Sequence, residues 1–298
     1  MKTIITHPHF NELWESISKK MWIKKAKITF EKFPDTWPNF FIENVKQDVE
    51  HREVTYIWDF STPQLIFENY VIMRGILDYH VKKLRVIMPY FPVGTMERIN
   101  IKWEVATAKY FAEIFSNLPS GTAWKTSIHI LDIHALSERF FFDSHRVNID
   151  THTAMNLIKQ KVSPETVIVF PDDWAKKRFW NDFKDYETIV CAKTRIWDKR
   201  EIIITEWNPK NKDLLIVDDL IQSGWTIIES TKVLKRMWAK NISAFATHWI
   251  FPNNSYVKLS KHLDILYVTN SIPKNLESAK KIKNMEVLDI WSIIEKVM

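Results

Sequence analysis

Two adjacent carboxylates, Asp218 and Asp219, are the residues of this chain best suited to chemistry. They end a short apolar run in the segment DLLIVDDLIQSGWT, and a small polar loop and a helical pattern follow them. In α/β proteins ligands bind at the carboxyl ends of strands, and the free amides of a helix N-terminus attract phosphate. The segment therefore predicts a site for a phosphorylated sugar, with the carboxylates on its hydroxyls. The plainer alternative is a buried strand whose terminal carboxylates are only solvated.

The loop after the carboxylates is predicted to cradle the phosphate. Its hydroxyls, on Ser223 and Thr226, stand beside the unpaired N–H groups that a helix N-terminus leaves. One residue does not suit this task, because Trp225 places a bulky side chain where the backbone has to approach a phosphate closely. The candidate loop residues are Gln222, Ser223, Gly224, Trp225 and Thr226.

The glycine and tryptophan counts are both abnormal. The chain has 4 glycines and 14 tryptophans, whereas an average usage of roughly 7% would give about 21 glycines in a chain of this length. Trp37, Trp197 and Trp207 are flanked by turn-forming residues. Trp238 follows an amphipathic helical pattern, at a position that favours glycine. We hypothesise that many tryptophans are glycines in the natural protein, because the source organism reads the stop codon UGA as glycine. The alternative is a genuinely tryptophan-rich core.

Strand and helix patterns alternate along the whole chain, and they must position these residues. The alternation favours the α/β class with a largely parallel sheet. After a less regular stretch around residues 140–163 the pattern starts again, so the two halves are predicted to be similar α/β units. We expect a first domain over residues 1–150 and a second over residues 151–298.

Composition narrows the class of protein. A net charge of +6, with acidic and basic residues interspersed, suits phosphorylated small molecules as well as nucleic acid. No basic helix or interleaved aromatic and basic ribbon stands out, so nucleic-acid binding is a remote alternative. The single cysteine, Cys191, excludes an internal disulfide and favours a reducing, cytoplasmic setting. Neither a signal-peptide pattern nor an apolar run of membrane-spanning length is present, so no membrane association is expected.

Several stretches together resemble one enzyme family. They are KFPDTWPN, MPYFPVGTMERI, WEVATAKYFAEIFSNLP, LDIHALSERFFF, VFPDDWAKKRF, IVCAKTRIWDKR, VDDLIQSGWTIIE and ATHWIFP. The chain resembles ribose-phosphate diphosphokinase, also called PRPP synthetase, over roughly residues 30–290, and is closest to its phosphate-independent plant-type branch. The resemblance implies two tandem phosphoribosyltransferase-like domains. It also implies transfer of the diphosphoryl group of ATP to the C1 hydroxyl of ribose 5-phosphate, giving PRPP and AMP for nucleotide biosynthesis.

The resemblance also bears on the tryptophans and on regulation. The family expects glycine at or near Trp37, Trp103, Trp174, Trp197, Trp207, Trp225 and Trp238. Where many relatives carry a further arginine in the GTMERI loop, this chain has Thr95. That departure puts phosphate activation and ADP inhibition in doubt.

The family's nucleotide-binding residues map onto the first half of the chain. Phe33 and Asp35 match a segment that contacts adenine from a neighbouring subunit, which implies at least a homodimer. Glu97 and Arg98 match a loop near the nucleotide. His134 matches a ligand of Mg²⁺ or of the ATP phosphates. From the residues alone, a packed turn and a hydrogen-bonded histidine at a strand end are the alternatives.

The resemblance places the metal and the catalytic cations mainly in the second half. Asp172 joins His134 at the Mg²⁺ site, and this sparse set suits an ion that keeps phosphate and water ligands. Lys193 and Arg195 match a mobile catalytic loop that closes over the transferring group, where catalysis consists of positioning and charge neutralisation. An ordinary basic edge between strand and loop is the alternative for that pair.

Two other functions stay open at this point. One is a phosphoribosyltransferase that consumes PRPP, and the other is a non-catalytic, regulatory PRPP synthetase homologue. The two tandem units and the DIHA, FPDD and AKTR stretches count against the first. Intact His134, Lys193 and Arg195 count against the second.

Overall fold

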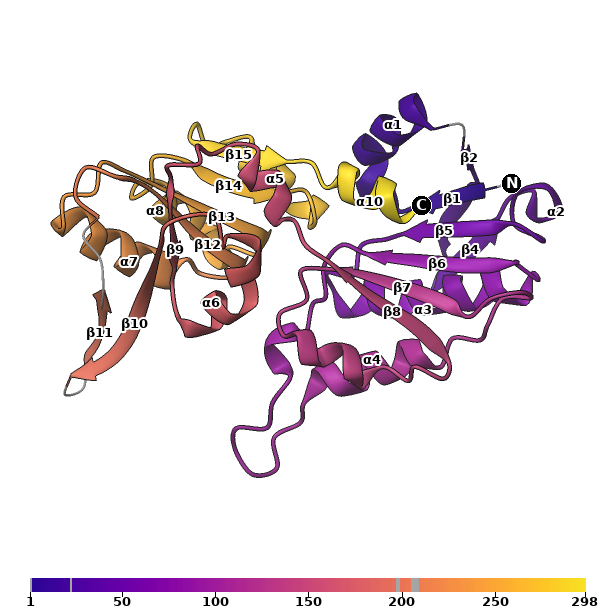
Figure 1. Ribbon diagram of the computed structural model, residues 1–298. Coiled ribbons are helices and arrows are strands. Elements are labelled where there is room, and N and C mark those ends of the chain that lie inside the picture. Colours follow the sequence, from indigo (N-terminus) through magenta and orange to yellow (C-terminus); the bar gives the residue numbers. More distant parts are fainter. Residues whose placement is uncertain (1, 22, 197–198, 205–208) are drawn as a thin grey trace. The chain divides into compact units, whose positions relative to one another are not determined.

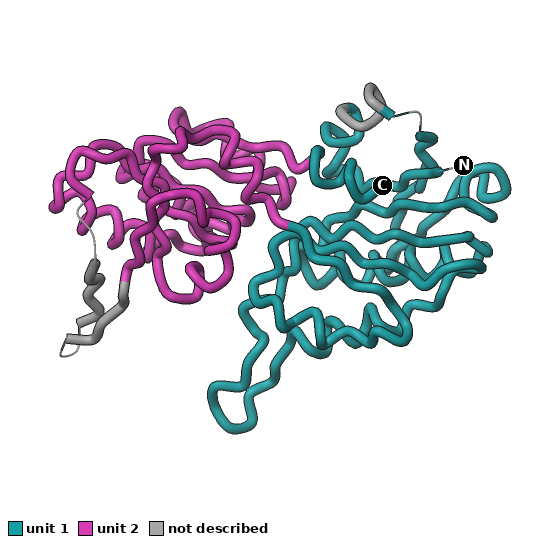
Figure 2. Tube along the Cα trace, viewed as in Figure 1, with its two compact units in different colours: residues 1–152, 291–298 teal, residues 153–290 magenta. Residues whose placement is uncertain are grey.

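The computed structural model describes residues 2–21, 23–196, 199–204 and 209–298, without the side chains of residues 16–20, 192–196 and 199–204. The chain divides into two compact units (Figure 2). Unit 1 consists of residues 1–152 and 291–298, and unit 2 consists of residues 153–290. The chain crosses between the units twice, so its last eight residues return to unit 1. We describe each unit by itself.

Unit 1 contains a six-stranded sheet in the order β2-β1-β5-β6-β7-β8, in which every neighbouring pair is parallel (Figure 1). A separate antiparallel hairpin, β3–β4, lies between β2 and β5 in the chain. The strands are β1 (Lys2–Thr6), β2 (Lys24–Lys25), β3 (Ile28–Lys32), β4 (Pro38–Ile42), β5 (Glu53–Ile57), β6 (Lys83–Met88), β7 (Thr126–Leu131) and β8 (Val147–His152). The helices are α1 (Asn11–Lys20), α2 (Val45–Asp48), α3 (Pro63–Asp78), α4 (Thr107–Ser116) and α10 (Trp291–Val297), with 3₁₀ turns η1 (Pro8–Phe10), η2 (Gly94–Met96) and η3 (Leu136–Phe141).

The core of unit 1 follows from alternation along its central strands. Apolar side chains at alternate positions of these strands, such as Val54, Tyr56 and Val86, are fully buried. They pack in one cluster with apolar side chains of α3 and α4, among them Met73 and Phe111. Because side chains of a strand alternate between faces, this pattern directs the apolar set of each strand to the helix-covered face.

Unit 2 contains a seven-stranded sheet in the order β11-β10-β9-β12-β13-β14-β15. Only the β10–β11 pair is antiparallel among its described strands. The strands are β9 (Val167–Phe170), β10 (Thr188–Ile196), β11 (Lys199–Ile204), β12 (Asp213–Ile221), β13 (Asn241–Trp249), β14 (Leu266–Thr269) and β15 (Met285–Leu288). The helices are α5 (Met155–Lys159), α6 (Asp173–Phe179), α7 (Trp225–Arg236), α8 (Tyr256–Ser260) and α9 (Leu276–Ala279), with 3₁₀ turns η4 (Trp180–Asp182), η5 (Pro252–Asn254) and η6 (Pro273–Asn275). The predicted α/β class with two largely parallel sheets is confirmed.

Each sheet has one point at which the strand order reverses. In unit 1 the chain leaves β1 toward β2 and later returns to β5, on the other side of β1. In unit 2 it leaves β9 toward β10 and β11 and returns to β12, on the other side of β9. The loops that leave two such strands diverge, and α/β proteins bind ligands in the crevice between them. We call the β1/β5 and β9/β12 positions the switch points of units 1 and 2.

Candidate active site

Three carboxylates gather at the switch point of unit 2. Asp218 and Asp219 lie near the carboxyl end of strand β12, where Asp218 is partly buried and Asp219 is buried. Asp172 follows the neighbouring strand β9 and caps α6, accepting a hydrogen bond from the Ala175 amide at 3.0 Å. Parallel pairing of β9 with β12 brings their carboxyl ends together.

The charges of these groups are coupled. The pKa of Asp218 is raised well above its usual value, first by burial, then by the negative charge of Asp219 and a hydrogen bond with it, and then by Asp172. A backbone hydrogen bond from the Asp219 amide to Asp218 Oδ1, at 2.9 Å, acts in the opposite direction. Such a cluster attracts either a cation or the hydroxyl donors of a sugar.

The donor set fits Mg²⁺, which prefers oxygen ligands and keeps several waters. In the described part of the chain no group of three histidine, cysteine or carboxylate side chains is arranged to hold a metal by itself. A magnesium ion that takes part of its shell from phosphate oxygens does not require one. Asp172 lies in unit 2 and His134 lies in unit 1. Each is a potential Mg²⁺ ligand and is described within its own unit.

The loop after β12 presents an uncapped helix N-terminus. Gly224 is the N-cap of α7, and no side chain caps the helix there. Its φ of +75° lies in the left-handed region that favours glycine, and a Cβ at this position would lie 3.0 Å from Leu259 Cδ2. Ser223 Oγ is 3.5 Å from the Trp225 amide, at the limit of a hydrogen bond. The amides of the first turn therefore remain available for an anion.

Trp225 begins α7 and is 56% exposed. Two lysine ammonium groups lie near its ring: Lys258 Nζ at 5.0 Å and Lys232 Nζ at 5.5 Å from the ring centroid. The ring thus lies near one cation of α7 and one of α8.

The tryptophans differ sharply in their surroundings. Trp103 and Trp238 have φ values of +77° and +64°, and their exposed fractions are 87% and 74%. Left-handed backbone is costly for a bulky residue and free for glycine. By contrast, Trp58 and Trp249 are buried, and Trp249 donates from its ring nitrogen to the Thr269 carbonyl at 2.7 Å. Trp197 and Trp207 lie outside the described residues.

In unit 1, His134 and the loop after β6 lie side by side. His134 follows β7 and is partly exposed. A Cβ at Gly94 would lie 2.9 Å from His134 Cβ, so only glycine allows this approach. The next residues, Glu97 and Arg98, form an ion pair at 2.7 Å, in which Glu97 is mostly buried and Arg98 half-exposed. The structure therefore brings these three candidates to the carboxyl ends of β6 and β7.

Phe33 and Asp35 lie on the turn of the β3–β4 hairpin. The Phe33 amide donates to the Trp37 carbonyl at 2.9 Å, and Asp35 Oδ1 accepts from the Trp37 amide at 3.4 Å. The Phe33 side chain is 51% exposed. The pair thus lies on an exposed turn, while His134, Glu97 and Arg98 lie at the carboxyl ends of β6 and β7.

The predicted catalytic residues Lys193 and Arg195 lie in β10, where their backbones pair with Ile202 and Arg200 of β11. Their side chains lie outside the described residues. The hairpin extends past the paired part of β9, which ends opposite Val190.

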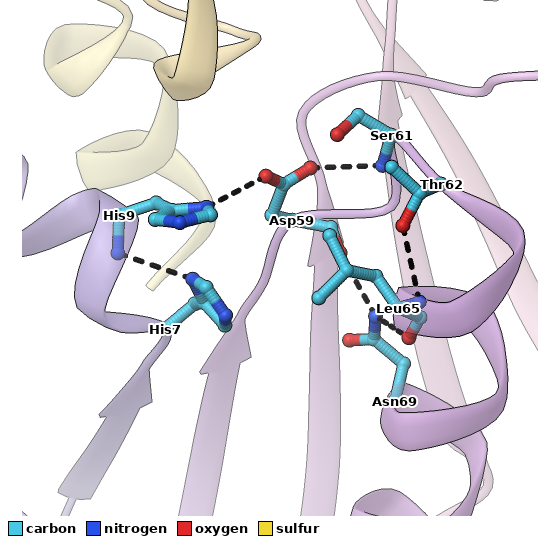
Figure 3. A network of polar contacts seen from close by, with 7 residues as sticks. All are labelled: His7, His9, Asp59, Ser61, Thr62, Leu65 and Asn69. Atoms are coloured by element: carbon cyan, nitrogen blue, oxygen red, sulfur yellow. Dashed lines mark hydrogen bonds and ion pairs between the residues drawn. The ribbon is translucent and has the colours of Figure 1, made fainter. Parts of the chain in front are cut away.

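Sequence reasoning did not identify a polar network at the switch point of unit 1 (Figure 3). Asp59 is buried, accepts from the Ser61 amide at 2.8 Å, and bonds His9 Nδ1 at 2.9 Å. The buried His7 accepts from the His9 amide at 3.1 Å. Burial, and then the neighbouring His9, lower the pKa of His7 to about 4. The available signal was positional, because His7 and Asp59 follow apolar runs just as Asp218 does.

Comparisons with known proteins agree with this arrangement. Residues 209–297 match the family model described as phosphoribosyl synthetase-associated domain. The chain is 35% identical to the chloroplastic ribose-phosphate pyrophosphokinase 3 of Arabidopsis thaliana over 295 residues, covering 95% of this chain and 71% of that protein. It is 36% identical to ribose-phosphate pyrophosphokinase 4 of the same plant, covering 90% and 82%. It is 28% identical to the ribose-phosphate pyrophosphokinase of Mycoplasma genitalium, covering 96% and 87%.

The fold has a close structural counterpart. The crystal structure of phosphoribosylpyrophosphate synthetase from Mycobacterium smegmatis superposes with a TM-score of 0.84 at 18% identity, covering 99% of this chain and 97% of the other. Among the described residues, none of the helices has the length and apolar character needed to cross a membrane.

Proposed function

The chain belongs to the ribose-phosphate pyrophosphokinase family, and on that premise we propose which of its residues carry out the reaction. The enzyme transfers the diphosphoryl group of ATP to the C1 hydroxyl of ribose 5-phosphate, giving PRPP and AMP. The observation that carries our assignment is the switch point of unit 2, where coupled carboxylates and an uncapped helix N-terminus adjoin.

Ribose 5-phosphate binds at this switch point. Asp218 and Asp219 accept hydrogen bonds from the ribose hydroxyls, and the amides and hydroxyls of residues 222–226 hold the phosphate. Hydroxyl donors offset the repulsion between the two carboxylates, so the site is electrostatically prepared for a polyol. The aligned amides of α7 supply the positive end of the helix dipole.

Asp172 of unit 2 and His134 of unit 1 are the residues that would hold Mg²⁺, with phosphate oxygens of ATP as its further ligands. When bound, the ion neutralises charge on the transferring diphosphoryl group. The chain's own contribution is to orient Asp172 through its hydrogen bond to the Ala175 amide. The absence of a side chain at Gly94 lets the loop that carries Glu97 and Arg98 approach His134 closely.

The nucleotide is bound by groups from two subunits. Glu97, Arg98 and His134 contact the nucleotide within one subunit, while Phe33 and Asp35 of a neighbouring copy contact adenine. An exposed aromatic ring on a hairpin turn suits stacking on a base, and a carboxylate suits its exocyclic amine. This arrangement requires at least a homodimer.

Lys193 and Arg195 act in catalysis by neutralising charge on the transferring group. Phosphoryl transfer requires little covalent help from the protein, so fixed positive charge is the main contribution available. Lys193→Ala should lower kcat far more than it changes the KM of either substrate. A change confined to KM would contradict this role. We place the enzyme in the cytoplasm on the basis of its single cysteine.

We further propose that exposed tryptophans in left-handed or turn positions are glycines in the natural protein. Trp103 and Trp238 support this through their backbone conformation, and Trp225 through its position in the phosphate loop. Sequencing the gene tests it directly, since UGG codons at these positions would refute it.

Activity is tested by measuring AMP formed from ATP and ribose 5-phosphate with Mg²⁺. The assay compares the tryptophan-containing chain with a variant in which seven tryptophans are replaced by glycine. The replaced residues are Trp37, Trp103, Trp174, Trp197, Trp207, Trp225 and Trp238. We expect AMP and PRPP in equal amounts from the glycine variant, and little or none from the tryptophan-containing chain. Absence of AMP from a folded variant would count against the assignment.

A further inference from the structure

The 3₁₀ turn η3, which follows His134, has a carboxylate inside and apolar side chains outside. Leu136 and Phe140 are exposed over 45% and 73% of their surface, whereas Glu138 is completely buried. Glutamate is almost never fully buried in proteins, because removing a carboxylate from water is costly. An apolar side chain could fill the interior position at lower cost. The position of Glu138 therefore indicates a contact that only a polar side chain can make.

Glu138 holds the backbone immediately after His134. Its Oε2 accepts a hydrogen bond from the Ala135 amide at 2.9 Å, and its own amide donates to the Ala135 carbonyl at 3.0 Å. Both backbone polar groups of Ala135 are thus paired with one residue. Ala135 is buried, so its amide would lose its acceptor without this carboxylate, and the backbone beside His134 would have to rearrange.

The same carboxylate oxygen also borders the loop that carries the other nucleotide-binding candidates. A Cβ placed on Gly94 would lie 3.5 Å from Glu138 Oε2 and 2.9 Å from His134 Cβ. Gly94 begins the turn η2, and Glu97 and Arg98 follow that turn directly. Glu138 therefore lies where the loop after β6 meets the turn after β7.

We infer that Glu138 is a positioning residue, which sets His134 relative to the loop of Glu97 and Arg98 and thereby determines the affinity for ATP. This inference rests on the proposed nucleotide site of unit 1. Because Glu138 is completely buried, it acts through the two backbone segments and not by touching the nucleotide. Its effect depends on the place of one oxygen atom, since that atom both accepts from Ala135 and borders Gly94.

The test separates the place of this oxygen from the charge of the carboxylate. Glu138→Gln keeps an oxygen acceptor at the same distance from the backbone and removes the charge. Glu138→Asp keeps the charge and withdraws the oxygen by one methylene. The matched control is Asp59→Ala, because Asp59 is also a buried carboxylate of unit 1 that accepts a backbone amide, from Ser61 at 2.8 Å. All substitutions are made in the glycine variant.

Two measurements are made on each protein. Calorimetry with ATP in EDTA gives the metal-free affinity, and the AMP-forming assay gives kcat and both KM values. Glu138→Asp should weaken ATP binding and lower kcat/KM for ATP by about 10- to 100-fold, because a small misplacement of binding groups is costly. The KM for ribose 5-phosphate should change less than about twofold. Glu138→Gln should stay within about threefold of the parent, and Asp59→Ala should keep the parent's ATP affinity.

The outcomes separate this inference from the proposed function. Unchanged ATP affinity in Glu138→Asp would overturn the inference, and so would an equal loss in Glu138→Gln, which would show that charge matters and not position. Equal weakening for ATP and ribose 5-phosphate would indicate a general structural role and would also overturn it. Failure of the glycine variant itself to bind ATP would overturn the proposed nucleotide site instead.

Discussion

The two switch points occupy the same place in two similar sheets, yet they are prepared for different tasks. In unit 1, Thr62 caps α3 by accepting from the Leu65 amide at 3.3 Å, and Pro63 in the first turn has no amide hydrogen to offer. The nearby carboxylate of Asp59 is satisfied by the Ser61 amide and His9. This switch point is closed by its own side chains.

In unit 2 the corresponding helix lacks a side-chain cap, and the carboxylates lie beside one another rather than beside a histidine. Gly224 provides no cap for α7, and Asp218 is held in a cluster that raises its pKa. The α/β topology thus supplies a potential ligand site in both units. The side chains that follow the strands then decide whether the site is open to a ligand.

The largest effect should come from removing a carboxylate at the open switch point. Asp219→Asn should lower kcat/KM for ribose 5-phosphate by about 10²- to 10³-fold, because charged hydrogen bonds to the sugar are lost. The matched substitution at the closed switch point is Asp59→Asn, and it should leave kcat/KM nearly unchanged. The coupled assay for AMP measures both. Equal losses in the two variants would contradict the distinction between the switch points.

At the closed switch point, the lowered pKa of His7 should make the free energy of unfolding depend on pH. The folded-state pKa of His7 is about 4, below its ordinary value of 6.5, because the ring is buried. Between these values the unfolded chain binds the proton more readily, so stability contributed by His7 is present above pH 6.5 and is lost as pH falls toward 4. The expected loss is about 3 kcal/mol. Chemical denaturation of His7→Gln should show a shallower loss over this range.

The open switch point should respond to pH in the opposite sense. Because burial, Asp219 and Asp172 raise the folded-state pKa of Asp218, the metal-free protein should lose stability as pH rises from the ordinary pKa to the raised one. Asp218→Asn should remove this slope, and Mg²⁺ or ribose 5-phosphate should reduce it. Urea titrations over a pH series measure the slope, and a stability rising through this window on account of Asp218 would refute the assignment.

A smaller effect is expected at the helix caps. Thr62→Ala should lower the free energy of unfolding by about 1 kcal/mol, because the Leu65 amide loses its side-chain acceptor. Ser223→Ala, before the uncapped helix α7, should change stability much less but weaken ribose 5-phosphate binding. Thermal unfolding and calorimetry distinguish these results. A stability loss in Ser223→Ala as large as in Thr62→Ala would mean that Ser223 is a structural cap.

An effect of similar size, but of opposite sign, is expected at the tryptophans. Trp238→Gly should raise stability by about 1 kcal/mol, since glycine relieves the left-handed backbone at a helix C-terminus. The control is Trp124→Gly, an exposed tryptophan without a positive φ, which should give no such gain. Equal effects of the two substitutions would show that backbone conformation is not what separates the tryptophans.

Local features of the site were predictable because they are continuous in the chain. The run DLLIVDD, the loop after it and helix α7 were all expected from the sequence, and Gly224 has the left-handed conformation that only glycine adopts freely. The tryptophan at position 238 was expected to occupy a glycine-favouring position, and its φ of +64° agrees with that. The roles of the site residues remain proposals.

The sequence by itself determined the α/β class and the segment from Asp218 to Thr226, because hydrophobic periodicity and turn residues act over a few neighbouring positions. Only the tertiary structure decided that Asp172 lies beside Asp218 and that Asp59 forms a hydrogen bond with His9. These contacts join residues far apart in the chain. Strand order brings them together, and the order of strands is set by the packing of the whole sheet rather than by any local pattern.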